Sequence, residues 1–423
     1  MDRLSENNVE IADGVLVRYG ATGPVAVVPK GVTAIGDGAF RGSGTLRRVI
    51  LPEGVTRIGK EAFADCASLT AAELPESLTD VGPAAFYCCR GLTDVRLPEG
   101  LTRIGEQAFS GCLCLRDLPL PESLVFIGDE AFLGCLSLGR VDLPRGLRHV
   151  GSAAFYHCSS LTVGRFPERL EFLGSWSFAD CRSLRRFVLP SAMEQLPTGV
   201  FSGCRSLEEV ILPKDLAEIG PRAFGDCTGL RRIAPLPPRI RHVGEEAFAG
   251  CRALADGDGF LILRGILFGY FGPRTGTVTL PEGVTRIDGG AFGTGEGLLD
   301  LRLPDSVIAA GPDAFYREDL ILRLRQWQPG LEEALTRCAR LILVTESGAG
   351  VPLRFRRAAR IGAALAGTAS PEDAAWLSQN SLFLCEEAFR IPAILHFLCD
   401  HRLIRPRDVD VWLEKAQIGR AHV

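Results

Sequence analysis

The stretch LPEGVTRIGKEAFADCASL, which runs from residue 51 to residue 69, decides the fold because the chain repeats it. LPEGLTRIGEQAFSGCLCL follows at residues 97–115, and LPEGVTRIDGGAFGTGEGL at residues 280–298. A repeat of about 20 to 50 residues indicates structural units that stack on one another rather than one globular core. The sequence therefore predicts a solenoid.

Twelve units can be aligned on an apolar residue followed by proline. Most units begin 23 residues after the one before, as Leu74 does after Leu51. A longer step and then an insert separate the last units. The openings are Val28, Leu51, Leu74, Leu97, Leu120, Leu143, Phe166, Leu189, Leu212, Leu236, Leu280 and Leu303, each followed by proline.

Each recurring position of a unit has a physical reason. Residues 47–51 alternate like a short, half-buried strand, and Pro52 ends it because proline cannot donate to a ladder. Residues 55–58 indicate a second strand, and Gly59 permits a sharp corner. Residues 61–63 suit one helical turn that inserts Phe63 into the core. One coil buries its apolar face only when neighbouring coils stack on it.

Nine cysteines recur with the same period and are expected to form one column through the stacked coils. Zinc sites need clustered ligands, such as closely spaced cysteine pairs or paired histidines, and this spacing is absent from the sequence. We therefore interpret the column as small buried side chains rather than as disulfides or a metal array. A long row of reduced thiols favours a reducing compartment. The column contains Cys66, Cys89, Cys112, Cys135, Cys158, Cys181, Cys204, Cys227 and Cys251.

The pattern L-P-x-x-V-x-x-I-G-x-x-A-F-x-x-C-x-x-L resembles the unit of the BspA-type leucine-rich repeat family, from Ile11 to about Arg323. A D-G-x-L-x-x-Y-x-G segment is also similar to an insert of that family. It matches residues 13–20, and residues 258–270 resemble a second, looser copy. The resemblance implies an α+β repeat protein: a right-handed, curved solenoid of short strands and helical turns that binds other macromolecules. Family members are often surface proteins with signal peptides.

The sequence divides into three parts. Residues 1–323 form the predicted solenoid, with an insert at 255–279 whose residues 261–270 indicate a hairpin. Residues 324–417 change to helical periodicity and are interpreted as an α-helical C-terminal cap or an ankyrin-like module. Ser370 is the expected N-cap of one of these helices. Residues 418–423 follow no helical pattern and are interpreted as an artefactual tail.

The most distinctive outward positions lie in the second strand, just before the repeated Ile or Val. Aromatic side chains stand there beside Arg and His, a composition typical of binding hot spots. The alternative is that these rings pack against neighbouring coils. The outward positions of the first strand mix charges of both signs and suit a protein partner or a solvated face. The candidate partner-binding residues are Arg57, Arg103, Phe126, His149, Phe172, Gln195, Glu218 and His242, and Asp80 occupies the same position in its own unit.

Charge and motifs narrow the function classes. The net charge of −4 carries no basic stripe, which argues against a nucleic-acid partner. The sequence has no catalytic or metal-binding motif, so we expect no enzyme activity and no cofactor. It shows neither a signal-peptide pattern nor a long apolar run, so we expect a cytoplasmic monomer without membrane insertion. The leading hypothesis is a non-catalytic protein-interaction scaffold. The alternative is a secreted or cell-surface adhesin for a host or matrix protein, exported by a signal peptide missing upstream.

Overall fold

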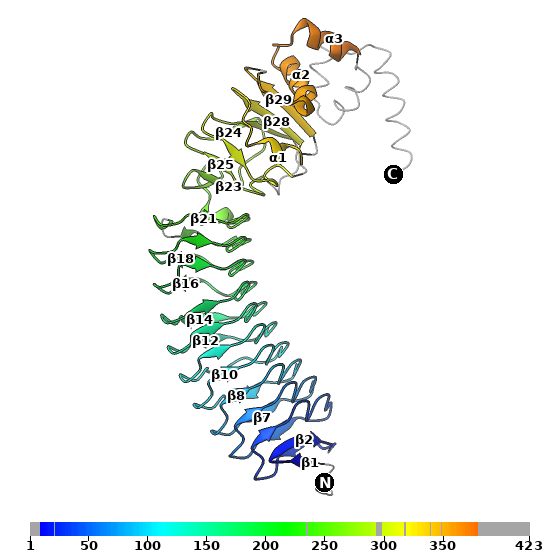
Figure 1. Ribbon diagram of the computed structural model, residues 1–423, viewed down its shortest axis with the longest axis vertical. Coiled ribbons are helices and arrows are strands. Elements are labelled where there is room, and N and C mark those ends of the chain that lie inside the picture. The colour runs from blue at the N-terminus through cyan, green and yellow to red at the C-terminus, as the bar shows by residue number, and fades with distance from the viewer. Residues whose placement is uncertain are drawn as a thin grey trace. The chain divides into compact units, whose positions relative to one another are not determined.

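The computed structural model describes residues 9–20, 22–233, 236–292, 298–316, 319–338, 340–347 and 349–379. The chain forms two compact units, Met1–Asp256 and Gly257–Val423, and each contains stacked coils (Figure 1). Parallel strands from successive coils pair side by side, which makes each unit a solenoid of the predicted kind. The right-handed curvature implied by the resemblance stays a prediction.

The first strands of the coils in the first unit form three parallel sheets. The first of these sheets ends at β9, because Pro119 occupies the strand position of the next coil and cannot donate a backbone hydrogen bond. The second sheet ends at β14. The sheets are β3 (Val25–Val27), β5 (Arg48–Ile50), β7 (Ala71–Glu73) and β9 (Asp94–Val95); then β12 (Arg140–Asp142) and β14 (Thr162–Arg165); then β16 (Arg186–Val188), β18 (Glu209–Ile211) and β20 (Arg232–Ile233).

The second strands form one long sheet and one short sheet. The long sheet contains β1 (Val9–Ala12), β2 (Val15–Tyr19), β4 (Ala34–Ile35), β6 (Arg57–Ile58), β8 (Asp80–Val81), β10 (Arg103–Ile104), β11 (Phe126–Ile127), β13 (His149–Val150) and β15 (Phe172–Leu173). The short sheet contains β17 (Gln195–Leu196), β19 (Glu218–Ile219) and β21 (His242–Val243). A short 3-10 helix, η1 (Arg252–Leu254), ends this unit.

The third side of each coil is not helical, so the predicted helical turns are wrong. Glu61 and Asp65 have φ angles of 55° and 60°, which lie outside the right-handed helical region. The amides of Glu61, Phe63 and Asp65 donate to carbonyls of the next coil, and Phe63 N lies 2.7 Å from Ala85 O. The amides of Ala62 and Ala64 instead close turns within the coil, as Ala64 N does to Glu61 O at 3.0 Å. This side is therefore a series of turns hydrogen-bonded from coil to coil.

The repeated phenylalanine and cysteine fill the interior as predicted. Phe155 is buried and stacks on the same residue of the coils before and after it, with ring centroids 5.1 and 5.3 Å apart. The nine cysteines of the column are buried, and each thiol donates to the carbonyl of an earlier phenylalanine, as Cys158 Sγ does to Phe132 O at 3.1 Å. The buried thiols thus gain a polar contact without leaving the core.

The glycine at the corner after the second strand is required by the closeness of the coils. A Cβ atom at Gly151 would lie 2.4 Å from the backbone nitrogen of Asp129 in the preceding coil. The amide of Gly151 also donates to Ile127 O at 2.9 Å, which continues the ladder of the second sheet. This corner therefore needs a residue that has no side chain and keeps its backbone N–H, which is glycine.

Each unit of the chain begins with an antiparallel hairpin. β1 and β2 turn at Asp13 and Gly14, whose φ angles are 49° and 77°. β22 (Phe260–Leu263) and β23 (Ile266–Tyr270) turn at Arg264 and Gly265, with φ angles of 53° and 75°. The hairpin predicted within the insert is confirmed. In register, residues 264–265 correspond to residues 13–14, so the second copy expected at residues 258–270 starts at residue 264 and not at residue 258. The second strand of each hairpin pairs with the first regular coil.

The second unit continues the coil pattern and then becomes helical. Its sheets contain β23, β25 (Arg286–Ile287) and β27 (Ala309–Ala310), and β24 (Thr277–Thr279), β26 (Leu298–Arg302), β28 (Asp319–Leu324) and β29 (Arg340–Thr345). Its helices are α1 (Glu332–Leu335), η2 (Leu353–Phe355), α2 (Arg356–Leu365) and α3 (Pro371–Gln379). The predicted N-cap is confirmed: Asp373 N donates to Ser370 Oγ at 3.1 Å. The helices predicted after residue 380 and the tail at 418–423 lie outside the described residues.

Candidate functional site

The candidate residues occupy one position on successive second strands, which we call the second-strand row. From Arg57 to Phe172 the row lies in the long sheet, and neighbouring members are paired directly in register. Gln195, Glu218 and His242 are paired in the same way in the short sheet. The structure therefore brings the predicted residues together as two consecutive groups.

The first group forms a continuous stack of charged and aromatic side chains. Asp80 Oδ2 lies 3.5 Å from Arg57 Nε, and its Oδ1 lies 3.8 Å from Arg103 Nε. The Arg103 guanidinium carbon lies 4.0 Å from the centroid of the Phe126 ring, which is a cation–π distance. His149 continues the stack, with its ring centroid 4.4 Å from that of Phe126. The long sheet thus presents alternating charges that end in aromatic rings.

His149 is held between two phenylalanine rings. Its centroid lies 4.5 Å from that of Phe172, and the two planes differ by 8°. Burial lowers the pKa of His149, and the positive charge of Arg103 lowers it further, while Asp129 acts in the opposite direction. The imidazole is therefore neutral at neutral pH, which suits a stack of uncharged rings.

The two phenylalanines of the row are not equally available to a partner. Phe126 is covered on one ring face by Arg103 and on the other by His149, so it packs against neighbouring coils. Phe172 stacks only on His149 in the described part of the chain, and 46% of it is exposed. The exposed aromatic surface of the row is therefore concentrated at Phe172.

The solenoid opens directly after Phe172. β15 and β17 belong to different sheets, and β14 and β16 are likewise not paired with each other. The third side stays closed at this junction, because Trp176 N donates to Thr198 O at 2.9 Å and Phe178 N to Val200 O at 3.0 Å. The two coils therefore separate on their strand sides and stay joined on their turn side.

Pro197 explains why the second sheet is interrupted. It stands at the corner that glycine occupies in the neighbouring coils, as at Gly174 and Gly220. The amide of Gly174 donates to Val150 O at 2.8 Å, whereas proline has no N–H to donate to Leu173 O. At Gly174 even a Cβ atom would lie 2.2 Å from the nitrogen of Ser152, so a proline ring at this corner requires wider spacing.

Two additional phenylalanines separate the same coils from inside. Phe187 is buried where the next coil carries Val210, and Phe166 replaces the leucine that opens most units. The Phe187 centroid lies 4.7 Å from that of Phe166 and 4.5 Å from that of Phe201. The Phe178 and Phe201 centroids are 6.2 Å apart, more than the 5.3 Å between Phe155 and Phe178. Added aromatic volume thus accompanies the wider spacing.

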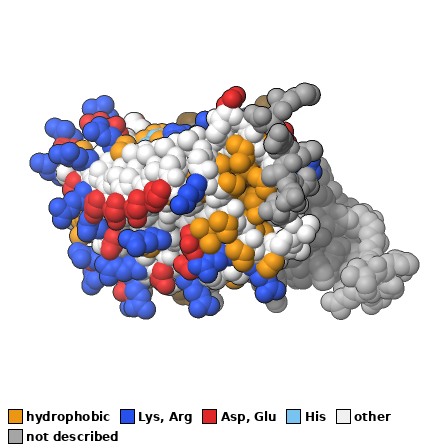
Figure 2. Space-filling view, turned by 90° about the horizontal axis from the view of Figure 1, so that it is seen from below, with side chains coloured by type: hydrophobic (Ala, Val, Ile, Leu, Met, Phe, Trp, Pro, Cys, Tyr) orange, Lys and Arg blue, Asp and Glu red, His pale blue; other side chains and the backbone are white. Residues whose placement is uncertain are grey.

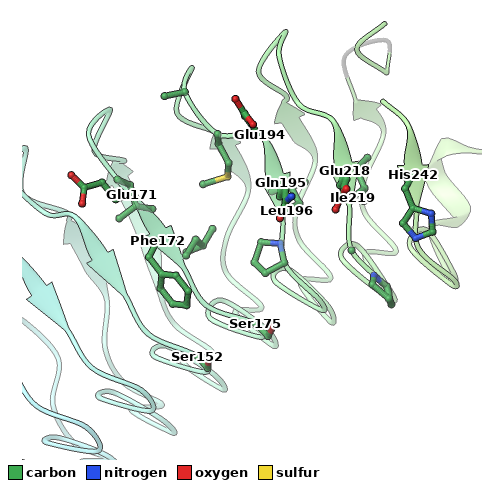
Figure 3. Close-up of a pocket in the computed structure, with 17 residues that line it drawn as sticks. Ser152, Glu171, Phe172, Ser175, Glu194, Gln195, Leu196, Glu218, Ile219 and His242 are labelled. Atoms are coloured by element: carbon green, nitrogen blue, oxygen red, sulfur yellow. The ribbon is translucent and has the colours of Figure 1, made fainter. Parts of the chain in front are cut away.

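The opening forms a groove of about 760 Å³, which we call the β15–β17 groove (Figure 3). Phe172, Gln195, Glu218 and His242 follow one another along it on successive coils. Leu173 lies in its wall and is 8% exposed, whereas Val150 one coil earlier is fully buried. The groove therefore reaches the edge of the core.

The β15–β17 groove is acidic. Its walls contain Glu171, Glu194 and Glu218 but neither Lys nor Arg. Glu171 Oε1 is paired with Arg148 Nη1 at 2.6 Å. Glu194 and Glu218 take part in no ion pair within the described residues. This differs from other parts of the surface, where Figure 2 shows acidic side chains in a row with basic side chains beside them.

The row follows from the repeat pattern of the sequence, whereas the groove was not predicted. The signal was present in the letters QLP at residues 195–197, where other coils have an aliphatic residue followed by glycine. Two phenylalanines at unusual positions, Phe166 and Phe187, were a second signal. Recognising the groove required knowing that the corner glycines are in contact from coil to coil.

The His, Cys, Asp and Glu side chains of the described residues form no group of three or more that could hold a metal ion. Within the same residues, no helix has the length and apolar character needed to cross a membrane.

Solved structures of bacterial leucine-rich repeat proteins are similar to this chain. One from Bacteroides ovatus is 22% identical, with a TM-score of 0.48, and the match covers 77% of this chain and 95% of that one. A leucine-rich cell surface protein from Faecalibacterium prausnitzii is 21% identical, with a TM-score of 0.47, over 85% of this chain and 97% of that one. A leucine-rich repeat protein of T. pallidum is 27% identical, with a TM-score of 0.30, over 59% and 87%.

The sequence matches none of the curated proteins with which it was compared. A profile of the BspA type leucine-rich repeat region matches it in 6 copies, over residues 25–139, 125–255 and 270–324. These ranges cover more than half of the 423 residues. They are also the residues whose strands stack into coils. The chain therefore belongs to the BspA-type leucine-rich repeat family.

Proposed function

We propose that this chain is a non-catalytic scaffold that binds another protein through the second-strand row and the β15–β17 groove. The observation that carries the proposal is the position of Phe172, an aromatic ring that is nearly half exposed beside an open groove. Exposed aromatic residues next to polar groups commonly supply most of the energy of a protein interface. The coils behind them are held by the buried phenylalanine column, so the surface is presented on a rigid support.

The same proposal includes a cytoplasmic monomer. The nine buried thiols support a reducing compartment, because long rows of unpaired cysteine are typical of proteins that are kept reduced. Fractionation of the source cells tests this location. Recovery with the soluble cytoplasmic proteins supports it, whereas release of the protein by protease treatment of intact cells favours the adhesin alternative. Size-exclusion chromatography with light scattering tests the monomer.

The experiment that tests the binding role is a quantitative pull-down from source-cell lysate. The test variant is Phe172→Ala/Glu218→Ala, and the matched control is Val188→Ala. Val188 is 44% exposed, close to the 46% of Phe172, but lies on β16 in the other sheet. A protein retained by the wild type and the control but lost with the test variant supports the proposal. Equal retention by all three proteins, with circular dichroism unchanged, contradicts it.

A further inference from the structure

We propose that the β15–β17 groove binds an extended, basic segment of a partner protein and that an arginine of this segment stacks on the open face of Phe172. The inference rests on the proposed function and specifies its site and the chemistry of its partner. Three independent features of the groove support it: an unfinished aromatic stack, an acidic lining without Lys or Arg, and an interrupted backbone ladder.

The first feature is the aromatic stack of Phe126, His149 and Phe172, whose two ends can be compared within this chain. At its other end, the Arg103 guanidinium covers the outer face of Phe126 at 4.0 Å and lies near Asp80. At the groove end, Phe172 has the equivalent outer face without a ring or cation on it in the described residues. An arginine is a suitable group for this face, because its flat guanidinium stacks on aromatic rings and pairs with carboxylates.

The second feature is the charge of the groove. Glu194 and Glu218 line it on the two coils that follow Phe172, and the lining includes no cationic side chain to neutralise them. A positively charged segment is attracted to this surface, and a phosphate backbone is repelled by it. The charge therefore favours a basic peptide over a nucleic acid.

The third feature is the open edge of the long sheet. In the preceding coil, Arg148 O accepts from Phe172 N at 3.0 Å and Val150 O accepts from Gly174 N at 2.8 Å. Among the described residues, no backbone amide of the next coil donates to the equivalent carbonyls at the groove, those of Glu171 and Leu173. An extended segment that lies along this edge can donate its own N–H groups to them, as in other cases where a peptide adds to a sheet edge.

The turn side determines how the segment enters. The hydrogen bond between Trp176 N and Thr198 O closes the groove at its base, so a segment reaches it from the strand side. Phe172, Gln195 and Glu218 face the space that such a segment would occupy (Figure 3). In an extended strand whose arginine is directed toward Phe172, the guanidinium can stack on the ring and pair with the acidic lining at the same time.

The probe that tests this inference is the peptide acetyl-Thr-Val-Arg-Val-Thr-amide, titrated into the full chain by isothermal calorimetry at low salt. The control peptide replaces arginine by citrulline, which has nearly the same shape without the charge. We expect the arginine peptide to bind and the citrulline peptide to bind at least about tenfold more weakly. Equal binding of the two peptides, or no binding of either, overturns the inference.

Variants of the protein then locate the site. Phe172→Ala and Glu194→Gln/Glu218→Gln should each weaken the arginine peptide about fivefold or more, whereas Val188→Ala should not. These are exposed residues, and unchanged circular dichroism checks that each variant folds. Unchanged affinity in both test variants overturns the assignment to the groove. If a lysate partner depends on Phe172 while no arginine peptide binds, this inference fails and the proposed function stands.

Discussion

Phe172 stacks on His149 with 4.5 Å between ring centroids, and the opposite face of Phe172 borders the β15–β17 groove. The same ring therefore ends a packed column and begins an open surface. Phe126, two coils earlier, is covered on both faces by Arg103 and His149. Two residues that look equivalent in the repeat thus have different surroundings, and the difference arises where the coil spacing changes.

Replacement of a column phenylalanine should be severe. Phe155→Ala removes a buried ring that stacks on both neighbouring coils, and we expect it to lower the free energy of unfolding by about 3–5 kcal/mol. Urea denaturation followed by circular dichroism measures this loss. Phe172→Ala is the control and should cost much less, because nearly half of its surface is exposed. A loss below about 1 kcal/mol for Phe155→Ala would show that the column is not a packed core.

The cysteines should differ sharply in reactivity. Burial raises the pKa of Cys66 to about 11 and that of Cys251 to about 12, so few of these thiols ionise at pH values where the protein is handled. Cys114 is exposed. We expect iodoacetamide to modify Cys114 first and the column thiols only after denaturation, as mass spectrometry of digested protein can show. Alkylation of Cys158 in folded protein at the rate of Cys114 would contradict the buried column.

The His149 stack should weaken in acid. The folded-state pKa of His149 lies below the value of about 6.5 expected in the unfolded chain, so below that pH the unfolded state takes up the proton more readily. The stabilisation from this group is therefore complete above about pH 6.5 and is lost as the pH falls through the lower folded pKa. His149→Phe keeps a stacked ring without the titration. The stability of the variant relative to wild type should rise between about pH 7 and pH 5.5 in urea denaturation. A constant difference would contradict the neutral stack.

The width of the groove should depend on two residues. Phe187→Val/Pro197→Gly restores an aliphatic residue and a corner glycine, as in most other coils, so the coils should approach to the regular spacing. We expect the arginine peptide to lose its binding and the new amide at position 197 to exchange slowly, as that of Gly174 should. A crystal structure of the double variant checks the spacing directly. A groove that stays open would mean that other residues set it.

The sequence predicted the features that repetition encodes and missed those that depend on contacts between coils. The strand positions, the buried cysteines and the Phe63 position follow from alternation and volume, and the structure confirms them. The helical turn predicted around Glu61 is wrong, because a left-handed φ at a residue other than glycine leaves little trace in one sequence. The groove was missed because Pro197 acts through the coil before it, where Gly174 and Leu173 set the available space.

The prediction of the binding surface has a similar limit. Outward residues of the second strand could be recognised from the pattern, and the structure places them in register. The exposure of these residues could not be recognised from the pattern, because it depends on whether the next coil carries a stacking side chain. Phe126 has Arg103 and His149 as neighbours, whereas Phe172 is followed by the displaced strand of Gln195.

The most direct test of this account is amide hydrogen exchange on either side of the groove, since its central claim is that the solenoid opens between β15 and β17. The amides of Ala217 and Glu218 donate to Glu194 O at 2.7 and 3.2 Å, while those of Glu194 and Gln195, one coil earlier, have no such acceptor in the described residues. We predict fast exchange at Glu194 and Gln195 and slow exchange at Ala217 and Glu218. Equally slow exchange at all four amides would contradict the account, because it would mean that the coils are paired throughout.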